Sequence, residues 1–355
     1  MKKQLFSLLL AVLLCLSLTP SSLAAGGEGY EGYSDVPENH WAAGSIRRAT
    51  ELGLFQGVGD GLFGLGRPIS RAAFATAMTR LFGWEEVCPD KPSYTDVARN
   101  SWYYTAVETV LANDAVAASG HTFRPEDELT RGEMASMLVR GLGYTSLAGT
   151  AADYGVPFSD VAVNKGFITV AYDLGLMDGK GGGRFDPDAS ATREQAATVL
   201  VRVYEQCAVE SVRLSADADC QLITISTPTA QPDAEMPVTP LEPLPELYAT
   251  LRRMKNNGAD MSQVALRLMA GGVRTITDAG GNPIAASQLI TAGEVQEALR
   301  QKDVHIFYSE QYESAYCIYP PNAYQTAYVW YQSEESMAAK LQMARLFGVT
   351  RYILE

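Results

Sequence analysis

The sequence predicts a mostly α-helical region of three tandem repeats packed about a common axis, followed by a small mixed α/β domain. Each repeat opens with an aromatic residue, a Ser or Thr, an Asp and a Val; the aspartates are Asp35, Asp96 and Asp160. Each repeat also carries an Arg directly after a Ser or Thr, namely Arg71, Arg131 and Arg193. These arginines lie 60 and 62 residues apart, and a Phe precedes each by eight residues. Such a constant register predicts a tandem array of equivalent binding sites.

Each repeat is expected to contain two short helices. The first ends ten residues before the Phe, at a residue type that tolerates left-handed backbone: Gly53, Asn113 and Gly175. The second begins at a capping hydroxyl, and Glu or Gln completes a capping box in the second and third repeats; the boxes are Thr130 with Glu133 and Thr192 with Gln195. Apolar residues then recur at helical spacing. Two short helices cannot bury such faces alone, so the three repeats are expected to share a core.

The first residues have the composition of a secretory signal peptide. Lys2 and Lys3 precede an apolar run over 5–18, and small residues follow it up to Ala24. No later stretch reaches the roughly 20 apolar residues of a membrane helix, so no membrane insertion is expected after cleavage. A Pro-rich stretch has the composition of an extended spacer between the repeats and the second domain. The expected division is a signal peptide at 1–24, repeats at 30–88, 89–150 and 151–205, a linker with short strands at 206–245, and an α/β domain at 246–355.

Charge and cysteine content restrict the partners. The chain carries 28 basic and 41 acidic side chains, a formal net charge of −13. It should therefore repel nucleic acid and anionic membranes over most of its surface, and an anionic ligand must be held by local arginines. No CxxC pair indicates zinc, and the acidic segment 178–188 lacks the spacing of a calcium loop, so no metal or other cofactor is expected. Cys207 and Cys220 are candidates for one disulfide in an oxidising exterior.

The repeats resemble S-layer homology domains, the wall-anchoring triplets of many Gram-positive surface proteins. The resemblance rests on the Ser/Thr-Asp-Val openings, on Trp41 and Trp102, on the turns at Gly53 and Gly175, and on the sequence Thr130-Arg131-Gly132-Glu133. It covers roughly residues 30–205. It implies a three-pronged helical spindle with a pseudo-threefold axis. Its grooves are expected to bind a secondary cell-wall polysaccharide, often one that bears ketal-linked pyruvate, or a peptidoglycan-linked glycan. It also implies a secreted protein held non-covalently at the cell wall or S-layer.

The candidate polysaccharide-binding residues are the three arginines, the three opening aspartates, Trp41 and Trp102. An Arg grips a carboxylate with two parallel hydrogen bonds, and at the first position of a helix it lies beside free backbone N–H groups. The alternative is that these arginines only pair with acidic neighbours such as Glu133. For the aspartates we favour hydrogen bonds to nearby backbone N–H groups over contact with sugar. For the two tryptophans we favour core packing over stacking on sugar. The third repeat has no Trp, and Val163 or Phe167 takes that place.

The C-terminal part predicts a mixed arrangement of helices and strands. We expect helices near 244–254, 262–269 and 292–301, a strand and turn at 273–283, strands at 304–308, 315–319 and 327–331, a helix capped by Ser333, and a last strand at 349–354. His305 and Cys317 both lie in these apolar strands, so buried core positions are expected rather than a catalytic thiol pair.

The end of the chain weakly resembles the last strand-helix-strand of family-18 glycoside hydrolases. Tyr328 to Tyr331, a helix over 336–346 and a strand from Gly348 carry this likeness. The family's catalytic Asp-x-Asp-x-Glu does not occur in the sequence, and without its Glu no general acid protonates the glycosidic oxygen. We therefore expect a displayed, non-catalytic domain. The alternative is a wall-acting glycosidase that the repeats deliver to its substrate.

Overall fold

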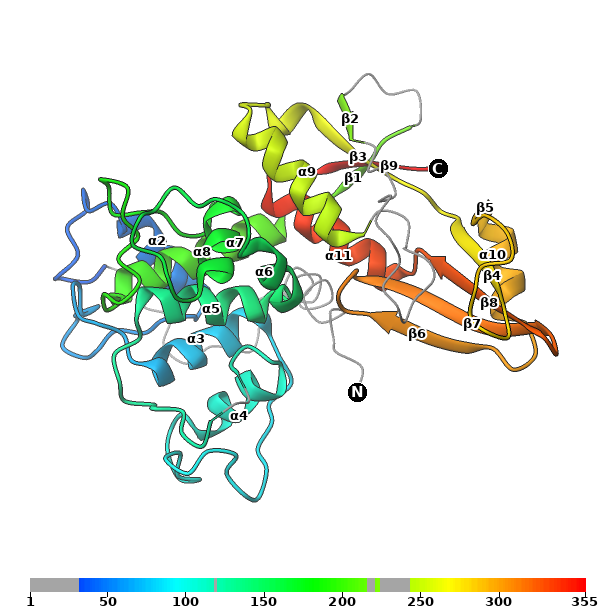
Figure 1. Cartoon of the computed structure of the whole chain (residues 1–355). Coiled ribbons are helices and arrows are strands. Elements are labelled where there is room, and N and C mark those ends of the chain that lie inside the picture. Colours follow the sequence, from blue (N-terminus) through cyan, green and yellow to red (C-terminus); the bar gives the residue numbers. More distant parts are fainter. Residues whose placement is uncertain (1–31, 118–119, 216–220, 224–242) are drawn as a thin grey trace, which may run out of the picture. The chain divides into compact units, whose positions relative to one another are not determined.

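The computed structural model describes residues 32–117, 120–215, 221–223 and 243–355, which form two compact units (Figure 1). The units are Met1–Ala208 and Val209–Glu355. The expected signal peptide, Cys220 and most of the expected Pro-rich spacer lie outside the described residues. Within the described ranges, no helix is both long and apolar enough to cross a membrane. As predicted, the first unit is helical and the second combines helices with parallel and antiparallel sheets.

The described part of the first unit consists of three helix pairs and one additional helix. The pairs are α2 (Ala43–Glu51) with α3 (Arg71–Phe82), α4 (Tyr104–Ala112) with α5 (Arg131–Gly141), and α7 (Lys165–Asp173) with α8 (Arg193–Ala208), while α6 (Thr145–Ala151) joins the second pair to the third. The second helix of each repeat packs on the first helix of the next: α3 on α4, α5 on α7, and α8 back on α2. The repeats therefore form a closed ring, and each completes the core of its neighbour.

Backbone hydrogen bonds close the same ring at its axis. Ile69 donates its N–H to the carbonyl of Ala191, Ala191 donates to Leu129, and Leu129 donates to Ile69, over 2.8–2.9 Å. All three side chains are buried. The donors and acceptors of three loops satisfy one another, so the axis contains no unpaired backbone group at these positions.

Two local predictions for the helix ends are wrong. The left-handed residue after α4 is Asp114 rather than Asn113, so the following loop is one residue shorter than those after Gly53 and Gly175. Ser70 caps α3 and Thr130 forms the predicted capping box with Glu133. In the third repeat, however, the side-chain oxygens of Thr192 and Gln195 have no hydrogen-bond partner among the described residues. The predicted third capping box is therefore absent.

Helix α6 was not predicted from the sequence, and it depends on a glycine in the next helix. A Cβ atom at Gly166 would lie only 1.7 Å from the carbonyl oxygen of Ala148. Backbone therefore packs directly on backbone where α6 crosses α7. Because real Cβ atoms do not approach an oxygen so closely, a side chain at Gly166 would force the two helices apart.

The second unit contains a parallel and an antiparallel sheet. The parallel sheet has the order β1-β9-β3-β2, with β1 at Val212–Arg213, β2 at Gln221–Ile223, β3 at Val264–Leu268 and β9 at Arg351–Leu354. The antiparallel sheet has the order β5-β4-β8-β7-β6, with β4 at Gly272–Asp278, β5 at Gln288–Ile290, β6 at His305–Ser309, β7 at Ser314–Asn322 and β8 at Gln325–Tyr331. The helices of this unit are α9 (Leu244–Asn256), α10 (Ala292–Leu299) and α11 (Glu334–Leu346).

Most C-terminal predictions are confirmed, and two are wrong. The predicted helix at 262–269 is a short 3₁₀ turn, Met261–Gln263, followed by strand β3. A short apolar run does not distinguish a buried strand from a helix, and here β2 and β9 flank it on both sides. Cys317 is buried, and burial raises the pKa of its thiol to about 11. His305 is exposed rather than buried. It pairs with Ile318, the residue after Cys317, so the two side chains lie on opposite faces of the sheet.

Candidate functional site

The three opening aspartates fix the loops that carry the buried Phe residues. Asp35 accepts hydrogen bonds from the N–H groups of Phe63, Gly64 and Leu65, each over 2.8 Å. The other two aspartates accept two each: Asp96 from Phe123 and Arg124, and Asp160 from Phe185 and Asp186. This is the backbone role that we favoured from the sequence. Contact between these aspartates and sugar stays a prediction.

The hydrogen bonds to Asp35 and Asp160 favour their ionised carboxylates. Burial opposes ionisation of Asp35, but the N–H groups of Leu65, Phe63 and Gly64 outweigh it and hold its pKa below the usual value. The N–H group of Phe185 is the main cause of the lowered pKa of Asp160. The folded chain therefore holds these protons less tightly than the unfolded chain does.

The first unit is therefore expected to lose stability in acid. Because the folded pKa values of Asp35 and Asp160 lie below the unfolded value of about 3.9, their contribution is complete well above pH 4 and is lost as the pH falls through the folded values. Asp35→Asn with Asp160→Asn should lower the melting temperature at pH 7 and flatten its dependence on pH between about 5 and 2. Thermal unfolding followed by circular dichroism measures this, with Asp60→Asn at an exposed turn as control. A pH profile as steep as that of the wild type would contradict the assigned role.

The three repeat arginines reach across the ring to the Phe of the next repeat. The Arg131 guanidinium lies 4.6 Å from the centre of the Phe185 ring. Its Nε donates to the Phe185 carbonyl over 2.9 Å, and one terminal nitrogen donates to the Asp178 carbonyl over 2.7 Å. Arg193 repeats this geometry on the first repeat, with bonds to the carbonyls of Phe63 and Gln56. Each of these arginines thus connects two repeats.

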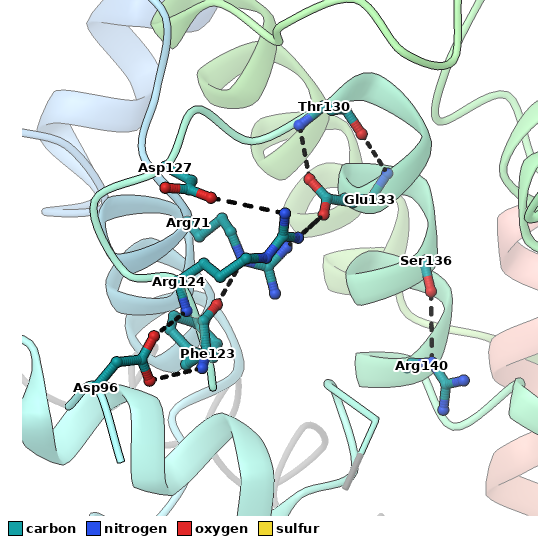
Figure 2. Close-up of polar contacts among 9 residues, drawn as sticks. All are labelled: Arg71, Asp96, Phe123, Arg124, Asp127, Thr130, Glu133, Ser136 and Arg140. Carbon is teal, nitrogen blue, oxygen red and sulfur yellow. Dashed lines mark hydrogen bonds and ion pairs between the residues drawn. The ribbon is translucent and has the colours of Figure 1, made fainter. Parts of the chain in front are cut away.

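Arg71 departs from this pattern (Figure 2). Its Nε donates to the Phe123 carbonyl over 2.8 Å, but a terminal nitrogen forms an ion pair with Glu133 at 3.0 Å. Arg124 contacts the same carboxylate, and the figure shows both guanidinium groups converging on Glu133. Within the described part of the chain, neither Arg131 nor Arg193 forms an ion pair. The acidic pairing considered as an alternative therefore applies to one arginine of the three.

The backbone N–H groups at the helix starts are not free, contrary to the expected arrangement. Arg71 and Ala72 donate their N–H groups to the carbonyls of Asp127 and Pro125. The corresponding N–H groups of α5 go to Ala189 and Pro187, and that of Arg193 goes to Arg67. These groups hold the repeats together, so an anion would be bound by side chains rather than by the helix termini.

The two candidate tryptophans, Trp41 and Trp102, lie on the surface, and their predicted core packing is wrong. Trp41 is 62% exposed and Trp102 is 66% exposed. Both precede the first residue of their helix by two positions, and Val163 occupies the same place before α7 with 70% exposure. A large exposed indole adds little to folding and offers a flat apolar face to a ligand.

A pocket of about 180 Å³ brings Trp41 and Arg131 together. The third repeat contributes Asp178, Lys180, Gln195 and Arg202 to its lining. Arg202 pairs with Asp178 at 2.9 Å, whereas Arg131 and Lys180 form no ion pair with any described residue. The pocket thus has surplus positive charge on an acidic chain. Sequence reasoning missed Lys180 because this residue lies in the rejected calcium-like segment, and missed Gln195 because it was assigned to a capping box.

No described group of three or more acidic, His or Cys side chains is arranged to hold a metal ion. The candidate site therefore consists of cationic and aromatic side chains between repeats. Burial lowers the pKa of Arg131, yet a guanidinium stays protonated at any physiological pH. The chemistry that this arrangement supports is the binding of an anion that also has an apolar face.

Comparison with known proteins identifies the repeats. Residues 32–75, 93–135 and 157–197 each match the S-layer homology domain. The chain is 27% identical over 195 residues to the S-layer protein sap of Bacillus anthracis, covering 55% of this chain and 23% of that protein. It is 32% identical over 209 residues to an endoglucanase of Bacillus sp. (strain KSM-635), covering 56% and 22%. The chain thus matches less than a quarter of the length of either relative.

The chain thus contains three S-layer homology domains. Part of it is also similar to the spore cortex-lytic enzyme SleL of Bacillus cereus, with a TM-score of 0.32 and 14% identity over 39% of this chain and 31% of that one. The resemblance of the repeats that was expected from the sequence is thus found.

Proposed function

We propose that the chain is anchored non-covalently to the cell wall by its three repeats, which bind an anionic, pyruvate-bearing secondary cell-wall polysaccharide. The observation that carries this proposal is the pocket that places the exposed Trp41 beside Arg131, which forms no ion pair with any residue that the structure describes. A ketal-linked pyruvate presents a fixed carboxylate on a sugar ring. The guanidinium and Lys180 attract the carboxylate, and the indole of Trp41 packs against the apolar face of the ring.

The closed ring suits a polymeric ligand. Corresponding junctions between repeats recur around one closed ring, so successive sugars of one polymer, or several polymers, engage the same anchor. Once one groove holds the polymer, a second groove of the same anchor meets that polymer at a high effective concentration. Weak individual sites then give stable retention without a covalent bond.

We further propose that the C-terminal unit is displayed without glycosidase activity. The sequence lacks the Asp-x-Asp-x-Glu motif of family-18 hydrolases. The buried carboxylate of Glu313 accepts a hydrogen bond from the Tyr308 hydroxyl over 2.8 Å, so it is engaged within the fold. Release of reducing ends from purified peptidoglycan by the secreted chain would contradict this part of the proposal.

Co-sedimentation of the secreted chain with purified cell walls tests the anchoring. Most of the protein is expected in the pellet with intact walls. Mild acid hydrolyses pyruvate ketals, so walls treated in this way should release the protein to the supernatant. Equal pelleting with both preparations would show that a pyruvate carboxylate is not the group recognised, and no pelleting with either would refute anchoring.

A further inference from the structure

The three grooves differ in the residue that faces the repeat arginine. Because the repeats form a ring, each Arg faces the third residue of the second helix in the next repeat. That position is Glu133 beside Arg71, and the contact is observed. It is Gln195 beside Arg131, where both residues line one pocket. The same relation places Ala73 beside Arg193. The group at this position is therefore a carboxylate beside Arg71, an amide beside Arg131 and a methyl group beside Arg193.

Glu133 holds a full negative charge beside Arg71. Burial opposes its ionisation, but the N–H group of Thr130 and the charges of Arg71 and Arg124 outweigh this and lower its pKa. Arg124 also approaches Asp127 at 3.6 Å. The two arginines and two acidic groups of this cluster therefore compensate one another. An incoming carboxylate would displace Glu133 or lie beside it, and both cost free energy.

Gln195 places no carboxylate at this position beside Arg131. It is neutral, and its side-chain oxygen has no hydrogen-bond partner among the described residues. Arg131 is 5% exposed and faces no carboxylate within ion-pair distance in the described chain. The exposed residue before the first helix of each repeat also differs between grooves. Trp41 lies beside Arg131. The order of the repeats around the ring then assigns Trp102 to Arg193 and Val163 to Arg71. The groove that contains the internal carboxylate is thus also the groove without an indole.

We propose that the grooves of Arg131 and Arg193 bind the anionic glycan and that Glu133 closes the groove of Arg71. This inference rests on the function proposed above, and it makes the residue at the third helical position the determinant of anion binding. Glu133 then acts as an internal substitute for the carboxylate of the ligand. The anchor binds two anionic sugars for each chain rather than three.

Exchanging the side chains of Glu133 and Gln195, each in its own variant, tests the proposal. Calorimetric titration of the secreted chain with the methyl glycoside of a pyruvate-ketal N-acetylhexosamine is expected to give two sites. Gln195→Glu should reduce this to one site, because it places a carboxylate beside Arg131. Glu133→Gln with Val163→Trp should raise it to three, and a Gln at that position still accepts the hydrogen bond of the capping box. Circular dichroism checks that both variants fold.

The possible outcomes separate the two proposals. Three sites in the wild type, or an unchanged number of sites in both variants, would overturn the closure of the Arg71 groove while leaving anchoring intact. Absence of binding by every variant would overturn both. Two sites that become one and three in the respective variants would support both.

Discussion

Replacing both Trp41 and Trp102 by Ala is expected to abolish most wall binding while leaving the fold unchanged. The two indoles are exposed by 62% and 66%, so they contribute little to the core, and exposed substitutions change stability by only about 0.5 kcal/mol. Loss of the apolar contact with the sugar should weaken each groove about tenfold, which is about 1.4 kcal/mol. Because both open grooves lose affinity, the effect on a polymer is larger than on a single sugar.

Val163→Ala is the matched control for this double variant. Val163 occupies the equivalent position in the third repeat and is 70% exposed, but it lies in the groove that Glu133 closes. Its replacement should leave both the melting temperature and the pelleting with cell walls unchanged. If the Trp double variant bound walls as tightly as the Val163 variant, the grooves would not be the binding site.

Phe185→Ala is expected to cause the largest loss of stability in the first unit. The ring is completely buried, lies 5.4 Å from the ring of Phe158, and is covered by the Arg131 guanidinium. Removing a buried Phe side chain costs about 3–5 kcal/mol through lost burial and the cavity left behind. At about 2–4 °C for each kcal/mol, the melting temperature should fall by roughly 6–20 °C.

The same substitution should also weaken binding, because Arg131 loses the surface that positions it. Thermal denaturation and wall pelleting at a temperature where the variant is folded separate the two effects. Phe307→Ala is a control in the second unit, where the ring is 43% exposed and little change is expected. A shift for Phe185→Ala no larger than that of this control would contradict its role in the junction between repeats.

The helical repeats were predictable because each depends on local signals. Ser70 and Thr130 cap their helices as expected, and the constant spacing of the arginines revealed the three equivalent units. The exposure of Trp41 was not predictable in this way, since an indole at a helix start is compatible with either environment. Only the ring arrangement shows that no neighbouring helix covers it.

The pairing within the site depends on contacts between distant residues. Arg71 and Glu133 lie 62 positions apart, and their contact follows from the order in which the repeats meet. Local rules assigned Gln195 to a capping box in its own helix, whereas the structure places it in the pocket shared with Arg131. Strand β3 was missed for a related reason: its two partners come from other parts of the chain.

The return of α8 to α2 has a consequence for how the anchor behaves under load. An open stack of repeats can fray from either end, one module after another. Here the first and last modules support each other, so neither end is a weak point and any module that detaches breaks two junctions at once. The three modules should therefore resist mechanical pulling together and give way in a single event.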